Sequence, residues 1–330
     1  MIKIVSLHVT NRCNSKCRHC FVDGGQSKFE EMTTDQIKKF IDEFAIASEG
    51  KGRINVFGGE PLIRDDIYEI IEYTHEKGLE IELATGGVVT DDRIQKLIEA
   101  RPDYMSFDLD GGTAESHDWL RNNPGHFERM KKIIQRFIDA SIYTNIVMVV
   151  NNMNRKEVGK FLDICKELKV QESTLQFFNA MGRGKLIEDL VVNAADWLET
   201  KGEVEKWINE NNPEFTIAWQ KAYMNKNDDL NEKVWDCKTE NTERLFLRTN
   251  GEVYRCALLY GSDMCIGNVK EESFLDILKR FNENKYVCKN IKGCPAISWH
   301  TNGSPLEDDP RDIENQIEPT CPREREYYTF

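Results

Sequence analysis

The 330-residue chain lacks the marks of several protein classes. No apolar run approaches the ~20 residues that a membrane-spanning helix needs. The opening residues MIKIVSLHV are too few and turn polar too soon for a secretory signal peptide. Basic residues are outnumbered, 44 Lys and Arg against 57 Asp and Glu, and a net charge of −13 argues against a surface that binds duplex nucleic acid. We therefore expect a cytoplasmic protein with no membrane partner and no nucleic-acid partner.

Cysteine, by contrast, is abundant, with ten in the chain. Nine fall in two groups, residues 13–20 and 237–321, and only Cys165 stands apart, in a helical pattern where we expect a small buried side chain. A chain of this length buries a sufficient core without disulfides, and without an export signal its thiols stay reduced. Clustered cysteines in such a chain indicate metal binding or reactivity.

The first part of the chain alternates strand and helix patterns, which predicts an α/β fold with parallel strands. Strands are predicted at Ile2–Val9, Arg53–Phe57, Leu79–Ala84, Tyr104–Leu109, Ile142–Val150 and Ser173–Phe178. Helices are predicted at Thr33–Ser48, Asp65–Lys77, Asp91–Ala100, Phe127–Ala140 and Arg155–Leu168. Binding sites of such folds lie at the C-terminal ends of the strands. The loops that follow four of these strands are polar or rich in glycine, as a ligand site requires.

The composition changes twice after this region and predicts three parts: 1–182, 183–235 and 236–330. The middle part is polar, carries three spaced tryptophans and is interpreted as a helical linker. The last part is small and rich in cysteine and loops. It holds a predicted helix at Ser273–Phe281 and a predicted β-hairpin that turns at Asn250-Gly251.

Three cysteines, Cys13, Cys17 and Cys20, lie within eight residues of the loop after the first strand. Zinc is a competing ligand because it also binds cysteine, although zinc motifs usually come as paired C-x2-C units. Three thiolates on a cubane iron–sulfur cluster would leave one iron without a protein ligand. That iron could hold a small molecule.

The three-cysteine loop resembles the signature of radical S-adenosylmethionine (radical SAM) enzymes, in which Cys13, Cys17 and Cys20 would hold a [4Fe-4S] cluster. An aromatic residue precedes the last cysteine in that family, and His19 stands there in this chain. The resemblance implies a partial (β/α)6 barrel that binds S-adenosylmethionine (SAM). It also implies reductive cleavage of SAM to a 5′-deoxyadenosyl radical, which abstracts hydrogen from a substrate, with flavodoxin or ferredoxin as electron donor.

A glycine-rich motif of the same family is matched after the second strand. The motif resembles the segment that contacts the amino group of the methionine moiety of SAM, and it consists of Gly58, Gly59, Glu60 and Pro61. Glycines let a ligand approach the backbone closely, and Glu60 offers charge for an ammonium group.

Three further matches follow along the chain. Thr85 opens a Thr-Gly-Gly segment that resembles the family's usual Thr-Asn-Gly, without the central Asn. Ser106 resembles the strand-four serine that often contacts the ribose of SAM. Arg121, which ends a His-Asp-x-x-Arg segment, resembles an arginine that can pair with the SAM carboxylate, because a guanidinium fork suits that group.

The second cysteine group resembles the SPASM/Twitch domains, which carry auxiliary iron–sulfur clusters. A full domain of this kind would have one cysteine near Lys285 and another near Ser298, and this chain has neither. Its remaining cysteines therefore do not supply four thiols to each of two clusters. Either one cluster is held by four thiolates, or two clusters have open or non-cysteine ligands; a zinc-stapled tail is the alternative. Cys265 and Cys321 are candidates for additional ligands or for a hydrogen-atom donor to a substrate radical. The first-choice ligands are Cys237, Cys256, Cys288 and Cys294.

The resemblance implies a peptide as substrate, because most SPASM/Twitch relatives modify peptides or proteins by crosslinks, thioethers, epimerisation or oxidation. The chain starts directly with a strand, so we expect no N-terminal domain that recognises a leader peptide. The alternative within enzymes is the dehydrogenation of a sugar or aminocyclitol alcohol, with an auxiliary cluster as electron acceptor. The alternative outside enzymes is an iron–sulfur electron carrier, which would not need the glycine-rich motif at a strand end.

Overall fold

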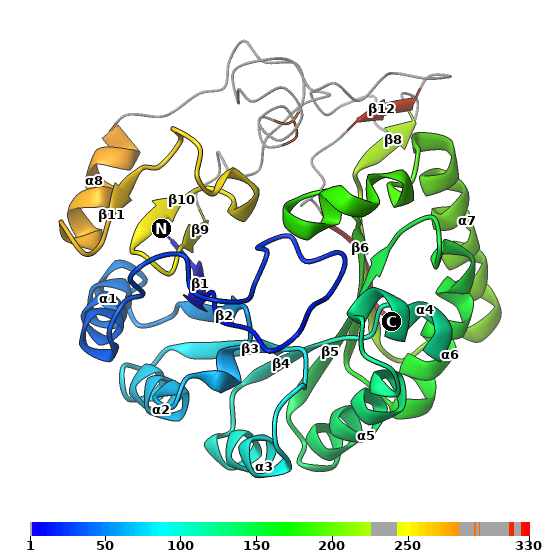
Figure 1. The fold of residues 1–330 in the computed structure, drawn as a ribbon, viewed down its shortest axis with the longest axis horizontal. Helices are drawn as coiled ribbons and strands as arrows, with labels where there is room; N and C mark the ends of the chain where they lie inside the picture. Colours follow the sequence, from blue (N-terminus) through cyan, green and yellow to red (C-terminus); the bar gives the residue numbers. More distant parts are fainter. Residues whose placement is uncertain (1, 226–242, 284–293, 295–296, 298–316, 320–324) are drawn as a thin grey trace.

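The computed structural model of the chain describes residues 2–225, 243–283, 294, 297, 317–319 and 325–330. Three of the cysteines singled out above, Cys237, Cys288 and Cys321, lie outside these residues. In the described part, an open, curved sheet is surrounded by helices on its outer side (Figure 1). None of the described helices is long and apolar enough to cross a membrane.

The main sheet has the strand order β11-β10-β9-β1-β2-β3-β4-β5-β6-β7-β13, and β1 to β7 are parallel neighbours. At its two ends, β10, β11 and β13 run antiparallel to their neighbours. These strands are β1 (Ile4–Thr10), β2 (Arg53–Gly58), β3 (Glu80–Thr85), β4 (Tyr104–Asp108), β5 (Tyr143–Val150), β6 (Glu172–Phe177), β7 (Thr216–Gln220), β9 (Arg244–Leu247), β10 (Glu252–Tyr254), β11 (Gly267–Asn268) and β13 (Arg325–Tyr328). A separate pair joins β8 (Tyr223–Asn225) to β12 (Ile317–Pro319).

Helices fill the connections between the parallel strands. They are α1 (Thr34–Ala47), α2 (Ile67–Glu76), α3 (Asp91–Ala100), α4 (Ala114–Arg121), α5 (His126–Asp139), α6 (Val158–Leu168), α7 (Ala194–Asn211) and α8 (Phe274–Glu283). Short 3₁₀ turns lie at Pro61–Ile63, Arg155–Glu157, Gly182–Leu190 and Ala257–Leu259. Helix α1 begins in a capping box, in which Thr33 and Gln36 each accept from the other's backbone N–H.

The two faces of the sheet differ in polarity, and this difference positions the site. Side chains on the outer face, such as Val5, Ile54 and Ile81, are buried against the helices in one large apolar core. Because side chains alternate along a strand, the neighbouring positions point into the barrel. Those positions include Ser6, Asn55, Glu82, Ser106 and Asn145, so the barrel interior is polar.

The predicted α/β architecture with parallel strands is confirmed, and all six predicted strands are present within two residues of their predicted ends. The stretch interpreted as a helical linker contains α7, but it also contains β7, which extends the parallel sheet beyond β6. Trp197 on α7 stacks on Trp219 of β7 at 4.1 Å between ring centroids, so the spaced tryptophans join a helix to a strand.

The C-terminal part attaches to the first strand of the barrel. Strand β9 pairs in parallel with β1, and the predicted hairpin is confirmed by the antiparallel pairing of β9 with β10. Gly251 in its turn has φ +90°, a conformation that favours glycine. Phe274 of α8 packs edge-on against Phe40 of α1, with ring centroids 5.0 Å apart. This packing places the cysteine-rich part beside the start of the barrel.

Candidate active site

The loop between β1 and α1 carries the three clustered cysteines and lies in the middle of the barrel opening (the dark-blue loop in Figure 1). The Cys13 amide donates to the Gly25 carbonyl oxygen and the Gly25 amide to that of Asn11, both at 2.9 Å, which closes the loop on itself. Arg183, which follows β6, donates from Nε to the Cys17 carbonyl oxygen at 2.9 Å and from Nη1 to that of Gly24 at 2.6 Å. The loop is therefore closed on itself and bound to the segment after β6.

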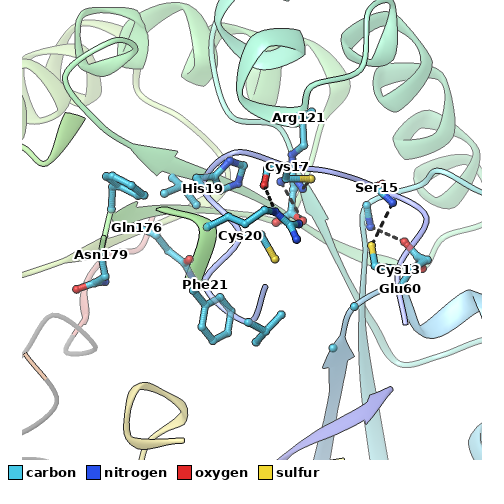
Figure 2. Close-up of a pocket in the computed structure, with 18 of the residues that line it drawn as sticks. Cys13, Ser15, Cys17, His19, Cys20, Phe21, Glu60, Arg121, Gln176 and Asn179 are labelled. Carbon is cyan, nitrogen blue, oxygen red and sulfur yellow. Dashed lines mark hydrogen bonds and ion pairs between the residues drawn. The ribbon is translucent and has the colours of Figure 1, made fainter. Parts of the chain in front are cut away.

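All three cysteines line one cavity of about 1000 Å³, part of which is open to solvent. Figure 2 shows Cys13 beside Glu60, Cys17 below Arg121, and Cys20 between them and Phe21. Burial raises the pKa of Cys13 to about 11 and also raises the pKa of Cys17. Because metal-bound cysteine is a thiolate, loading this site releases protons.

The two glycines of the predicted SAM motif bring the cysteine loop close to β2. A Cβ on Gly59 would lie 2.1 Å from the Arg12 carbonyl oxygen, and one on Gly58 would lie 2.4 Å from that of Thr10. Without those atoms, the Gly59 amide donates to Thr10 at 2.7 Å and the Glu60 amide donates to Arg12 at 2.9 Å. Both glycines also line the cavity, so their small size serves the loop contact and leaves the cavity wall as bare backbone.

Glu60 is 2% exposed and joins the ends of two strands. Its Oε1 accepts hydrogen bonds from the Leu62 amide (3.1 Å) and the Thr85 hydroxyl (2.8 Å), and its Oε2 accepts from the Gly86 amide (3.0 Å). Burial raises the pKa of Glu60 to about 7, although these three donors oppose the shift. Pro61 is buried and opens the short turn that follows. The structure thus brings Glu60, which lines the cavity of the cysteines, into contact with Thr85.

A buried ionic cluster lies on the other side of the cysteines. The Arg121 guanidinium makes ion pairs with Asp110 (2.6 Å from Nε) and with Asp108 (3.0 Å from Nη2), and its Nη1 donates to the Cys17 sulfur at 3.8 Å. His19 also contacts Asp110, at 3.3 Å. Burial alone would raise the pKa of Asp110, but Arg121 and His19 hold it at about 2.

Two histidines connect this cluster to the end of β3. The Asp110 amide donates to Nδ1 of His117, whose Nε2 lies 2.8 Å from Nδ1 of His126, and Nε2 of His126 lies 2.8 Å from the Gly86 carbonyl oxygen. Since a carbonyl only accepts, each ring carries its proton on Nε2 and stays neutral. Burial lowers the pKa of His117 to about 3 and that of His126 to about 4.

Ser106 does not line the cavity of the three cysteines. Its hydroxyl donates to Glu82 at 2.8 Å, and the residue lines a second cavity, of about 990 Å³ and partly open to solvent, inside the barrel. Asp108, two residues further along β4, lines both cavities and so connects the two. The inward side chain nearest the thiols on this strand is therefore Asp108.

The described cysteines of the C-terminal part lie in two settings. Cys256 and Cys294 are both buried in one apolar cluster with Met181, Tyr254 and Leu258. Cys265 is exposed, and its sulfur lies 3.3 Å from the Gly267 carbonyl oxygen. The structure thus places two of the predicted auxiliary ligands in one buried cluster and leaves Cys265 exposed.

The sequence resemblance extends to Asp108, which stands with Ser106 in the strand-four segment, but sequence analysis missed Asp110 and Arg183 as residues of the site. Asp110 stands in the same FDLDGG segment, where position after a strand end was a usable signal. Arg183 lies more than 160 residues from the cysteines it supports, and nothing in its local pattern indicates that contact.

The site fits a cubane cluster better than a single metal ion. Among the described residues, no group of three or more Cys, His, Asp or Glu side chains is placed to hold one ion. In a cubane each thiolate binds its own iron, so the cysteines need only face one cavity, as these three do. Gly58 and Gly59 leave bare backbone on the wall of the same cavity, where a ligand of the cluster would have room.

Comparison with protein families gives two matches. Residues 7–165 match the radical SAM superfamily, and residues 237–295 match the iron-sulfur cluster-binding domain known as SPASM.

Two curated proteins and one solved structure are similar over much of the chain. The AdoMet-dependent heme synthase of Methanosarcina barkeri is 30% identical over 93% of this chain and 95% of its own length. The mycofactocin maturase MftC of Mycobacterium tuberculosis is 29% identical over 59% of this chain and 51% of its own length. The structure of Streptococcus suis SuiB bound to its precursor peptide SuiA matches with a TM-score of 0.74 and 15% identity, over 94% of this chain and 75% of SuiB.

Proposed function

This chain belongs to the radical SAM superfamily and carries a SPASM domain, and from that premise we propose that it abstracts a hydrogen atom from a peptide. With its [4Fe-4S] cluster reduced and SAM bound, such an enzyme generates a 5′-deoxyadenosyl radical. The observation that carries the proposal is the convergence of Cys13, Cys17 and Cys20 on one cavity that continues, past Asp108, into a second one.

The chain's own residues supply binding and orientation. The bare backbone at Gly58 and Gly59 and the acceptor Glu60 form the wall on which the amino group of SAM would lie. The second cavity, with Asn55, Glu82 and Ser106 on its wall, would receive the part of the substrate that carries the C–H bond. Holding the two reactants in adjoining cavities keeps the radical close to its target and away from side reactions.

The similarity to the mycofactocin maturase supports a peptide substrate, although the chain spans about half of that relative. The cysteine-rich part supports the same class, because SPASM domains carry the auxiliary clusters of peptide-modifying enzymes. Cys256 and Cys294 are the described residues proposed as auxiliary ligands.

A second candidate substrate is a haem precursor. The heme synthase of Methanosarcina barkeri is matched over 95% of its length, so its likeness includes the C-terminal part. Arg244 and Arg325 line the second cavity and are suited to carboxylate side chains.

The test compares the two substrate classes in one assay. Anaerobically prepared protein would be given SAM, dithionite and either Fe-coproporphyrin III or short peptides encoded beside the chain's own gene. We expect 5′-deoxyadenosine together with a changed peptide mass, either a loss of two hydrogens or, in deuterated water, a gained deuterium. Turnover of Fe-coproporphyrin III to haem without any peptide turnover would overturn the peptide proposal in favour of the second candidate.

A further inference from the structure

We propose that Arg121 is a positioning residue of the first cluster and raises its reduction potential through a hydrogen bond to the Cys17 sulfur. The proposal goes beyond the proposed function, because it concerns the cluster before SAM or substrate binds. It gives Arg121 a contact in addition to the SAM carboxylate that the family resemblance implied.

All three guanidinium nitrogens lie close to a partner in the described structure. The Nε lies 2.6 Å from Asp110, the Nη2 lies 3.0 Å from Asp108, and the Nη1 lies 3.8 Å from the Cys17 sulfur. The side chain is only 9% exposed. A guanidinium has five N–H groups, so these three contacts fix its place beside Cys17 and leave donors for a further ligand.

Asp110, which pairs with Arg121, is itself held in place by β5 and by the loop that follows β5. Asp110 is fully buried, and its Oδ1 accepts from the Val149 amide at 3.0 Å. Its backbone carbonyl oxygen accepts from Asn154 at 2.9 Å. Since these contacts come from β5 and the loop beyond it, Asp110 cannot follow Arg121 toward a ligand without breaking them.

A second attachment brings Cys17 to the same place. The Arg18 amide donates to the Leu120 carbonyl oxygen at 2.8 Å, and the Arg18 side chain donates from Nε to the Trp119 carbonyl oxygen at 3.0 Å. The residue after Cys17 is thus bonded to the residue before Arg121. This backbone contact sets the distance between Cys17 and Arg121 independently of the ion pairs.

A hydrogen bond to a cluster sulfur is one of the levers by which a protein sets an iron–sulfur potential. The reduced cluster carries one more negative charge than the oxidised cluster, so a cationic donor at a ligand sulfur favours reduction. Asp108 and Asp110 together outweigh the charge of Arg121, so the proposal depends on the direct contact to the sulfur and not on the net charge of the group.

The experiment is a redox titration of the reconstituted cluster, followed by electron paramagnetic resonance, with no SAM or substrate present. We expect Arg121→Gln to lower the midpoint potential by at least about 59 mV, which corresponds to a tenfold fall in the equilibrium constant for one-electron reduction. Arg18→Gln is the matched control, because it removes the same charge next to Cys17 but no contact to a sulfur. Its midpoint should stay with that of the unaltered chain.

Arg121→Lys covers the case in which the Gln variant does not load a cluster. A lysine keeps the charge, but one ammonium cannot reach Asp108, Asp110 and the sulfur together, so a smaller lowering is expected. An unchanged midpoint in an Arg121 variant that binds SAM more weakly would overturn the proposal and return Arg121 to the SAM carboxylate. Because no substrate is used, a wrong substrate class has no bearing on the result.

Discussion

Glu60 is the carboxylate on which the junction of β2 and β3 depends. Its two oxygens accept from three donors, of which the Gly86 amide alone faces Oε2. Most buried polar groups keep their partners, and one left without a partner costs about 1–3 kcal/mol.

We predict that Glu60→Gln lowers the free energy of unfolding by about 1–3 kcal/mol, because the new NH₂ group would face the Gly86 amide. Urea denaturation of the anaerobic protein measures this. Glu82→Gln is the matched control, since Glu82 accepts a hydrogen bond from the Ser106 hydroxyl that a glutamine oxygen can keep. Equal stability of the two variants would show that the Gly86 contact contributes nothing.

Gly59 tests whether the cysteine loop must touch β2. A methyl group there would lie 2.1 Å from the Arg12 carbonyl oxygen, and overpacking of this kind costs about 1–3 kcal/mol. We predict that Gly59→Ala separates the loop from β2 and lowers the iron bound per chain after reconstitution. Gly25→Ala, in the same loop, has no atom within 4 Å of the added Cβ and should load normally. Normal loading of both variants would contradict this role of Gly59.

At the scale of elements, the two histidines that link β4 to β3 make stability depend on pH. Burial lowers the pKa of His117 to about 3 and of His126 to about 4, whereas an unfolded histidine titrates near 6.5. Between about pH 4 and 6.5 the unfolded chain therefore binds more protons than the folded chain, so stability falls as the pH falls.

We predict that the variant with both His117→Gln and His126→Gln loses less stability than the unaltered chain between pH 6.5 and 4.5. Denaturation midpoints at several pH values measure the slope. Glu60, whose pKa is raised to about 7, acts in the opposite direction, but it is common to both proteins. Identical slopes would mean that neither histidine is held neutral by the fold.

The elements that sequence patterns predicted well are those with an apolar buried face. Helix α1 buries Ile37, Phe40, Ile41 and Phe44 at helical spacing, and its cap is readable from Thr33. Helix α4 was not predicted, because its buried face includes Ser116, His117 and Arg121, which carry no apolar period. These polar side chains are buried because they contact other residues of the site, and such tertiary contacts cannot be predicted from the local sequence of the helix.

Strand β7 was missed for a different reason. Its five residues alternate between the outer side, where Trp219 packs, and the inner side of the barrel. An alternation of buried and inward-facing residues over only five positions does not stand out from the polar sequence around it. The cysteine spacing, in contrast, predicted which three thiols face one cavity, because a single loop carries all of them.

At the scale of the whole molecule, the polarity of the barrel interior distinguishes a ligand-holding barrel from a filled one. Small barrels are usually packed with side chains. Here a hydrogen-bond chain runs from Thr174 through Asn145 and Ser106 to Glu82 along one side of a cavity of about 990 Å³. The open sheet thus leaves a polar cavity beside the cysteine loop, where we propose that the substrate binds next to SAM.

The central claim is that the thiols of Cys13, Cys17 and Cys20 hold a cluster that cleaves SAM. The direct test is the 5′-deoxyadenosine formed by anaerobic protein with SAM and dithionite, for the unaltered chain, Cys17→Ala and Cys165→Ala. Cys165 is buried in α6, away from the cavity, and serves as the matched thiol control. We predict 5′-deoxyadenosine from the unaltered chain and Cys165→Ala and none from Cys17→Ala; equal product from all three, or a zinc-filled protein that forms none, would contradict the account.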